Sequence, residues 1–76
     1  KAGAVVADSV ITTKVKAALL ADPDVKSTDI SVETQNGEVM LSGFVRDKKQ
    51  VDRAMNIARN VEGVKGVQNK LSIKSA

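Results

Sequence analysis

Side chains that could carry out chemistry are scarce in this sequence. Its 76 residues include no histidine, cysteine, tryptophan or tyrosine. Their absence removes the commonest general base, the thiol nucleophile and the preferred ligands of transition metals. The remaining carboxylates would need a pocket to hydrolyse a substrate, and a domain of this size leaves little room for one. The sequence therefore predicts a protein that is not an enzyme and that uses no cofactor.

Three acidic residues close together in the chain, Asp22, Asp24 and Asp29, could in principle bind a cation. Carboxylate oxygens are ligands that calcium prefers, but the glycine and the bidentate glutamate of an EF-hand loop are missing. The alternative is that Asp29 hydrogen-bonds to nearby backbone where the chain enters a strand. We expect no metal site here.

The segment Gly63-Val64-Lys65-Gly66 matches the G-x-x-G loop with which KH domains hold a nucleic-acid backbone. In a KH domain that loop joins two helices, whereas here a strand is predicted to follow directly. The alternative is a helix C-cap at Gly63 followed by a turn. A basic ridge of Lys49, Arg53 and Arg59 is typical of a solubilising helix face. We therefore expect that nucleic acid is not the partner.

Two large apolar side chains and two lysines form the first candidate for a contact surface. Alternation along one predicted strand places Met40 and Phe44 on the face of the sheet that the helices do not cover. Lys70 and Lys74 lie beside them on another strand. Apolar groups framed by lysines could contact a partner protein, a second copy of the domain, or acyl chains below anionic headgroups. Alternatively, the lysine stems cover the apolar groups and nothing binds.

A second candidate surface lies on the first predicted helix. Val10 and Leu20 point away from its buried stripe, with Lys16 nearby. This strip could dock on a membrane or on a partner helix. The alternative is that Leu20 packs against Pro23 and Val25, which would leave no apolar strip to bind anything.

The segment from Ile30 to Val45 predicts a β-hairpin that positions the first candidate surface. Apolar and polar residues alternate on both sides of Asn36-Gly37. This pair favours a type I′ turn, because both of its central positions need a positive φ. Folding at the pair places Gly43 opposite Ile30 on the helix-covered face, where the missing side chain would let a helix backbone approach closely.

The first predicted helix begins with Asp8 or Ser9 as its N-cap and runs to about Ala21. It ends before Pro23, because a residue that precedes proline is displaced from the α region.

The second predicted helix follows Asp47, which forms a capping box with Gln50, and extends through Asn60. Gly63 then marks the exit from the helix, and the segment from Val67 to Lys74 alternates as a third strand.

These elements predict an α+β fold of order αββαβ, with two helices packed on one face of a three-stranded mixed sheet. The crossover through the second helix makes the second and third strands parallel neighbours, which places the second strand in the middle. In this arrangement the helices cover Val32, Leu41 and Ile73, while Phe44 points outward.

The composition fits one small domain. The chain is 42% hydrophobic and 28% charged, and its length is near the limit at which a single core is adequate. A net charge of +3 gives only weak, salt-sensitive attraction to phosphates or anionic lipid. No apolar run approaches the ~20 residues that cross a bilayer. We expect a single domain at residues 8–74, preceded by a disordered segment at residues 1–7.

The chain resembles the BON domain family, which is named from the osmotically inducible periplasmic protein OsmY and nodulation proteins. The resemblance covers Asp8 to Lys74 and is carried by Ile30-x-Val32, Asn36-Gly37-x-Val39-x-Leu41-Ser42-Gly43-x-Val45, Ala54-x-x-x-Ala58 and Val61-x-Gly63-Val64-x-x-Val67-x-Asn69-x-Leu71. The family's recurring glycine falls on Gly43. The sequence differs from the best-known relatives in carrying one copy instead of two, and neither predicted helix has an aromatic residue.

The resemblance implies a non-catalytic module of the Gram-negative envelope, located in the periplasm. It would contact anionic phospholipid surfaces or hydrophobic ligands during envelope or osmotic stress. The alternative is a protein–protein adaptor or a self-associating domain that uses the same uncovered sheet face, including weak pairing with a tandem copy. The partner is thus expected to be a phospholipid membrane surface or another envelope protein.

Overall fold

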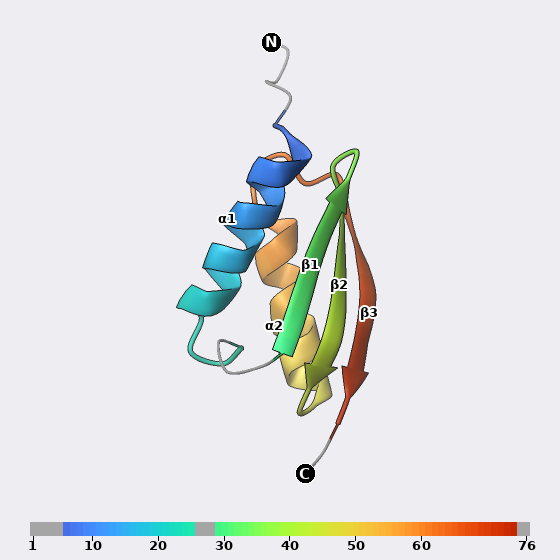
Figure 1. Ribbon diagram of the computed structural model, residues 1–76. Helices are drawn as coiled ribbons and strands as arrows, with labels where there is room; N and C mark the ends of the chain where they lie inside the picture. Colours follow the sequence, from blue (N-terminus) through green and yellow to red (C-terminus); the bar gives the residue numbers. More distant parts are fainter. Residues whose placement is uncertain (1–5, 26–28, 75–76) are drawn as a thin grey trace.

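The computed structural model confirms the predicted order of elements and describes residues 6–25 and 29–74. The elements are α1 (Asp8–Ala21), β1 (Asp29–Gln35), β2 (Glu38–Val45), α2 (Lys48–Arg59) and β3 (Gly66–Ile73) (Figure 1). Most of the segment expected to be disordered, residues 1–5, lies outside the described residues. Val6, which is described, packs against the core.

The hairpin has the predicted register. Asn36 and Gly37 have φ values of 52° and 83°, as a type I′ turn requires. Gln35 is opposite Glu38, and Ile30 is opposite Gly43. Because side chains alternate along a strand, this register decides which face of β2 each residue occupies.

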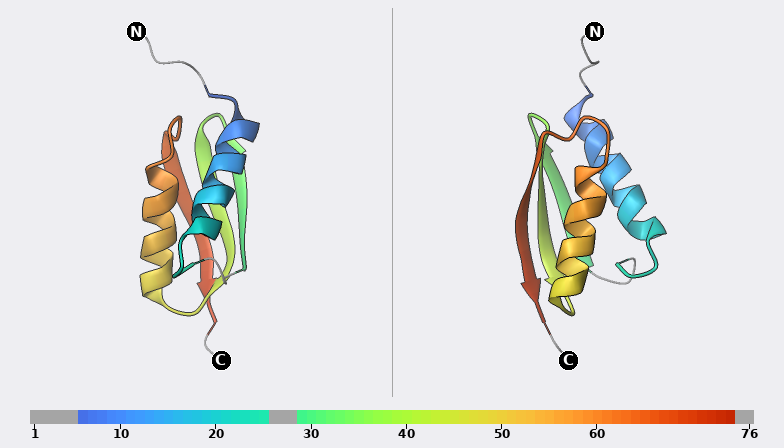
Figure 2. Two further views of the ribbon diagram at one scale, coloured as in Figure 1. Left: turned by 90° about the vertical axis from the view of Figure 1, so that its left-hand side faces the viewer. Right: turned by 180° about the vertical axis from the view of Figure 1, so that it is seen from behind.

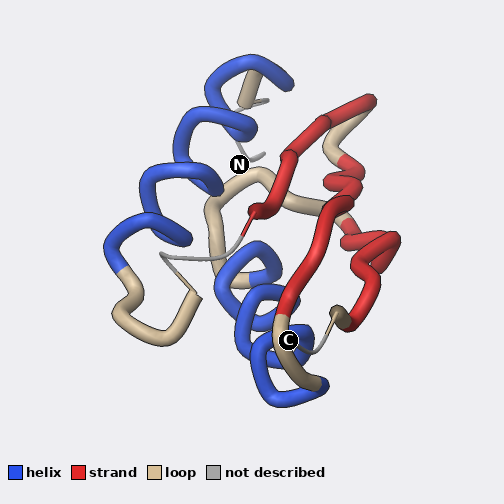
Figure 3. The backbone as a smooth tube through the Cα atoms, turned by 60° about the horizontal axis from the view of Figure 1, so that its bottom comes forward, coloured by secondary structure: helices blue, strands red, loops and turns tan. Residues whose placement is uncertain are grey.

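The sheet order is β1-β2-β3, with β1 antiparallel and β3 parallel to the central strand. Both helices lie on the same side of this mixed sheet, so the fold has one layer of helices and one layer of strands (Figures 2 and 3). Helix α1 packs mainly on β1 and α2 mainly on β3. The opposite face has no covering element within the described residues, and we call it the open face.

The start of α1 differs from the prediction that Asp8 or Ser9 is its N-cap. Ala7 is the N-cap residue and makes no side-chain cap bond. Asp8 is already helical, and its carboxylate accepts hydrogen bonds from the backbone N–H groups of Asn36 (2.8 Å) and Gly37 (3.0 Å). The carboxylate therefore caps the hairpin turn instead of its own helix.

The start of α2 confirms the predicted capping box. The Asp47 carboxylate accepts from the Gln50 N–H at 3.0 Å. The Gln50 side chain returns a bond to the N–H of Arg46 at 2.7 Å, one residue before the usual position. Both interactions are local in sequence, which is why the pattern could be recognised there.

The core lies between the helices and the inner face of the sheet. Its fully buried members are Ile11, Val15, Val25, Val39, Leu41, Ala54 and Ala58. Val32 is buried as predicted, but the prediction that the helices cover Ile73 is wrong, since Ile73 is 53% exposed. Ile73 is the last residue of an edge strand, so only one neighbouring strand flanks it and no strand residue follows it.

Gly43 allows a close approach, but the approaching backbone belongs to a strand. A Cβ atom there would overlap the carbonyl oxygen of Asp29 in β1 and would touch Ile30 Cα at 3.2 Å. The expectation that a helix backbone approaches Gly43 is therefore wrong. Gly43 also has a φ of +124°, a conformation that side-chain-bearing residues rarely adopt.

Candidate functional site

Alternation along β2 and β3 brings the four predicted contact residues to the open face. Phe44 is 51% exposed, Met40 is half-buried, and Lys70 and Lys74 are exposed. Lys70 lies opposite Ser42, the residue that separates Met40 from Phe44 on that face. The four side chains therefore share one surface, with the lysines along the edge next to the apolar pair.

The Lys74 ammonium group lies over the Phe44 ring, with Nζ 5.5 Å from the ring centroid. A cation–π contact of this kind is worth about 0.5–1 kcal/mol at an exposed site. The alternative in which lysine stems cover the apolar groups is thus partly realised. Even so, half of the Phe44 surface remains accessible, so Phe44 can still contact a partner.

The open face also carries three carboxylates that the candidate surface left out. Asp29 is the cross-strand neighbour of Phe44, Glu33 is the neighbour of Met40, and Glu38 lies at the hairpin end of β2. Acidic groups therefore line β1 and the hairpin end, while Lys70 and Lys74 line β3. The alternation of β1 predicts this face for Glu33, because its period is the same as that of β2, and the structure confirms that placement.

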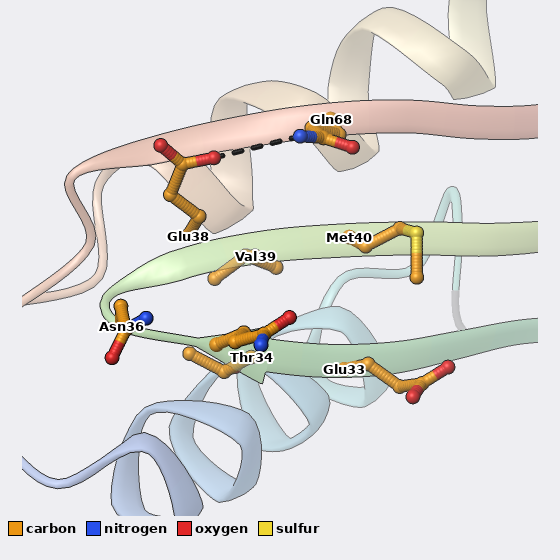
Figure 4. Close-up of a pocket in the computed structure, with 8 residues that line it drawn as sticks. Glu33, Thr34, Asn36, Glu38, Val39, Met40 and Gln68 are labelled. Carbon is orange, nitrogen blue, oxygen red and sulfur yellow. Dashed lines mark hydrogen bonds between the residues drawn. The ribbon is translucent and has the colours of Figure 1, made fainter.

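A hollow of about 510 Å³ lies at the hairpin end of the open face. Figure 4 shows Glu33 and Met40 at this hollow, with Gln68 Nε2 donating to Glu38 Oε1 at 3.5 Å. Two carboxylates, Glu33 and Glu38, are among its lining residues and favour a cationic group over an anionic one. The apolar end of the face, at Phe44, lies away from this hollow.

The second candidate surface, on α1, is exposed. Val10 is 43% exposed and Leu20 is 67% exposed, and Lys16 is exposed near them. The alternative that Leu20 packs against Pro23 and Val25 is therefore wrong. Val25 is buried without it, and an apolar strip remains on the outer side of α1.

The acidic cluster is engaged by an arginine. Arg53 Nε donates to Asp22 Oδ2 at 2.8 Å and lies 3.9 Å from Asp24 Oδ2, while Asp24 N–H donates to Asp22 Oδ1 at 2.8 Å. Partial burial acts to raise the pKa of Asp22, but the hydrogen bonds and the positive charge of Arg53 outweigh it and hold that pKa below its ordinary value. Within the described residues, no group of three or more potential ligands could hold a metal ion.

The G-x-x-G segment has a structural role. Helix α2 ends at Arg59, and Gly63, with a φ of +95°, lies in a later turn closed by Val64 N–H and Val61 C=O. The predicted helix C-cap at Gly63 is thus displaced to Asn60. The N–H of Lys65 donates to Gly37 C=O at 2.8 Å, so this loop is attached to the hairpin turn instead of standing free to hold a nucleic acid.

No helix in the described part of the chain has the length and apolar character to cross a membrane. Two exposed surfaces are candidates for binding: the Met40–Phe44 region with its lysines, and the outer strip of α1.

Comparisons with known proteins identify a family. The model of the BON domain family matches residues 7–75. The chain is 49% identical to the Osmotically-inducible protein Y of Escherichia coli over 76 residues, all of this chain and 38% of that protein. It is 45% identical over 60 residues to the Outer membrane lipoprotein DolP of Haemophilus influenzae, covering 79% of this chain and 31% of that protein. The chain thus spans about a third of the length of these relatives.

A solved structure shows the same fold. CdsD, described as a structural protein of the type III secretion system of Chlamydia trachomatis, superposes with a TM-score of 0.77 at 19% identity. The match covers 95% of this chain and 34% of that one. At this identity the likeness concerns the arrangement of helices and strands only.

Proposed function

We propose that this chain, which belongs to the BON domain family, is a periplasmic binding module. The family is non-catalytic. The module contacts anionic phospholipid surfaces or hydrophobic ligands during envelope or osmotic stress. Its relation to an outer membrane lipoprotein and to an osmotically inducible protein supports this setting. The remaining question is which part of the surface makes the contact.

The exposed Phe44 ring beneath the Lys74 ammonium group is the observation that carries the proposal. An aromatic ring can enter the headgroup region, while a lysine beside it attracts lipid phosphate at about 1 kcal/mol per charge. Ile73, exposed at the same end of β3 but on the helix side of the sheet, adds apolar surface to this end of the molecule. Lys70 supplies a second charge, and Met40 extends the apolar surface along β2.

Charge placement favours one orientation at a membrane. On the open face, Glu33 and Glu38 lie toward the hairpin, whereas the Phe44 end carries Lys74 together with a single carboxylate, Asp29. An anionic surface repels the first end and attracts the second. The domain would therefore approach with its Phe44 end. The outer strip of α1, with Val10, Lys16 and Leu20, is a secondary contact surface in this proposal.

Co-sedimentation with vesicles tests the proposal. Wild-type protein should bind vesicles that contain phosphatidylglycerol and should not bind pure phosphatidylcholine. Lys70→Glu should weaken binding by at least about tenfold, because it replaces an attractive charge with a repulsive one. Phe44→Thr should weaken it several-fold while keeping a residue suited to a strand.

Lys49→Glu is the matched control, since it makes the same charge change on an exposed residue of α2. It should retain most of the wild-type affinity. Equal losses in Lys49→Glu and Lys70→Glu would indicate attraction by net charge alone and would contradict a specific binding face.

A protein–protein adaptor or self-associating domain is the second candidate. It is favoured by the three stripes of the open face: acidic along β1, apolar along β2 and basic along β3. A second such face with aligned strands would place acidic residues over lysines. Sedimentation velocity distinguishes the candidates, because concentration-dependent dimerisation without vesicle binding would favour the adaptor.

A further inference from the structure

The two edges of the sheet differ in how their backbone groups are satisfied. The N–H of Lys74 donates to Val45 C=O. In β3, Lys74 and every second residue before it therefore direct their backbone N–H and C=O groups toward β2, and the residues between them direct these groups away from the sheet. Leu71 is one of the outward residues, and its N–H donates to the Asn69 side chain at 2.9 Å. The Asn69 side chain thus satisfies one of the outward backbone groups at the β3 edge.

The β1 edge has no such shield. The two-residue turn makes Gln35 and Glu38 a hydrogen-bonded pair, so the alternate residues Ile30, Val32 and Thr34 direct their N–H and C=O groups away from β2. Within the described part of the chain these outward backbone groups have no hydrogen-bond partner. They form a regular row along one strand.

Three devices that often protect an edge strand, a lysine, a proline and a β-bulge, are missing from β1. Its sequence, Asp-Ile-Ser-Val-Glu-Thr-Gln, contains no lysine and no proline, and its pairing with β2 is continuous without a bulge. Natural proteins use these devices to prevent unwanted strand pairing. An edge without them is suited to receive another strand.

We propose that the β1 edge binds an extended peptide segment by strand addition, with a lysine or arginine of the peptide opposite Ser31. Asp29 and Glu33 are exposed on the open face, on either side of Ser31 along the strand. Ser31 directs its backbone toward β2, so the peptide residue opposite it occupies a non-hydrogen-bonded pair, where side chains approach most closely. A basic side chain there lies between two carboxylates.

The charge of β1 favours a basic peptide over a second copy of this strand. Two β1 strands paired edge to edge would bring four carboxylates and no lysine to the new ladder. Like charges on neighbouring positions of a sheet are destabilising. The backbone pairing gives affinity, and Asp29 with Glu33 selects the side chain.

An NMR titration tests this site with a capped peptide of alternating valine and lysine, 7 residues long like β1. The expected result is shifted signals and slowed hydrogen exchange at the N–H groups of Ile30, Val32 and Thr34. Glu33→Gln should weaken binding about 3- to 10-fold, as expected for one ion pair that is partly shielded from solvent. Glu62→Gln, an equal charge change at an exposed residue outside the sheet, should leave the affinity unchanged.

N-methylation of the peptide provides the sharper comparison. Methylation of a valine N–H that faces β1 should abolish binding, whereas methylation of a lysine N–H that faces away should be tolerated. Equal effects at both positions would overturn the proposal. Signal changes at Ile30, Val32 and Thr34 on dilution without peptide would also overturn it, because they would identify a second copy as the occupant of the β1 edge.

The peptide site is distinct from the lipid surface, although Asp29 borders both. Phe44→Thr should keep peptide affinity while its vesicle binding weakens several-fold. Peptide-induced changes confined to the Phe44 end of the open face would contradict the edge site and leave the lipid proposal standing.

Discussion

At the scale of single residues, Gly43 is the position where the fold depends most on one side chain being absent. Its φ of +124° and the overlap that a Cβ would make with Asp29 both oppose substitution. We predict that Gly43→Ala destabilises the domain by at least about 3 kcal/mol in urea unfolding, since backbone strain and the steric overlap add together. Gly66→Ala is the control, because nothing lies within 4 Å of a Cβ there. Similar losses in the two variants would contradict this explanation.

Asp8 shows why some residue roles could not be predicted from sequence. Its position before an apolar stripe is typical of an N-cap, and a local pattern offers no other partner. In the structure the carboxylate accepts from Asn36 and Gly37, with sequence separations of 28 and 29 residues. A bond of this kind depends on how α1 crosses the hairpin, which only the tertiary packing defines.

At the scale of elements, period-two alternation was sufficient to predict the register of β1 and β2, because a shift by one residue would expose Val32 and Leu41. The same signal failed for Ile73, since alternation predicts the face of a strand but not where the covering helix ends. It also placed Phe44 on the open face. The register of the hairpin puts Asp29 beside Phe44, whereas the Lys74 contact depends on the pairing of β2 with β3.

The connection between α1 and β1 is attached to α2 by the ion pair of Asp22 and Arg53. The pKa of Asp22 is lower in the folded state than its ordinary value of 3.8, so the stabilisation is present above that pH and is lost as pH falls through the folded-state pKa. We predict that Arg53→Gln lowers the Tm at pH 7 and that the difference from wild type closes below about pH 3.8. Thermal unfolding by circular dichroism measures this difference.

Arg59→Gln, at an exposed residue of the same helix, should change the Tm less at pH 7. A gap between Arg53→Gln and wild type that stays constant from pH 7 to pH 3 would show that the ion pair does not stabilise the fold.

At the scale of the whole molecule, the two proposed binding sites meet at Asp29. This residue is the cross-strand neighbour of Phe44 and also one of the two carboxylates beside Ser31. At a membrane its charge opposes the attraction by Lys70 and Lys74, whereas at the β1 edge it attracts a basic peptide. One substitution should therefore change the two affinities in opposite directions.

We predict that Asp29→Asn strengthens binding to phosphatidylglycerol vesicles about fivefold, because one unit of repulsion near the surface is worth about 1 kcal/mol. The same variant should bind the valine–lysine peptide several-fold more weakly. Asp52→Asn, an exposed residue on α2, controls for the change in net charge and should affect neither site by more than about twofold, since screening at physiological ionic strength limits effects beyond about 8 Å. A lower vesicle affinity in Asp29→Asn would exclude the Phe44 end of the open face as the membrane contact. Any orientation that brings Phe44 to an anionic surface also brings Asp29 there, and the surface repels its charge.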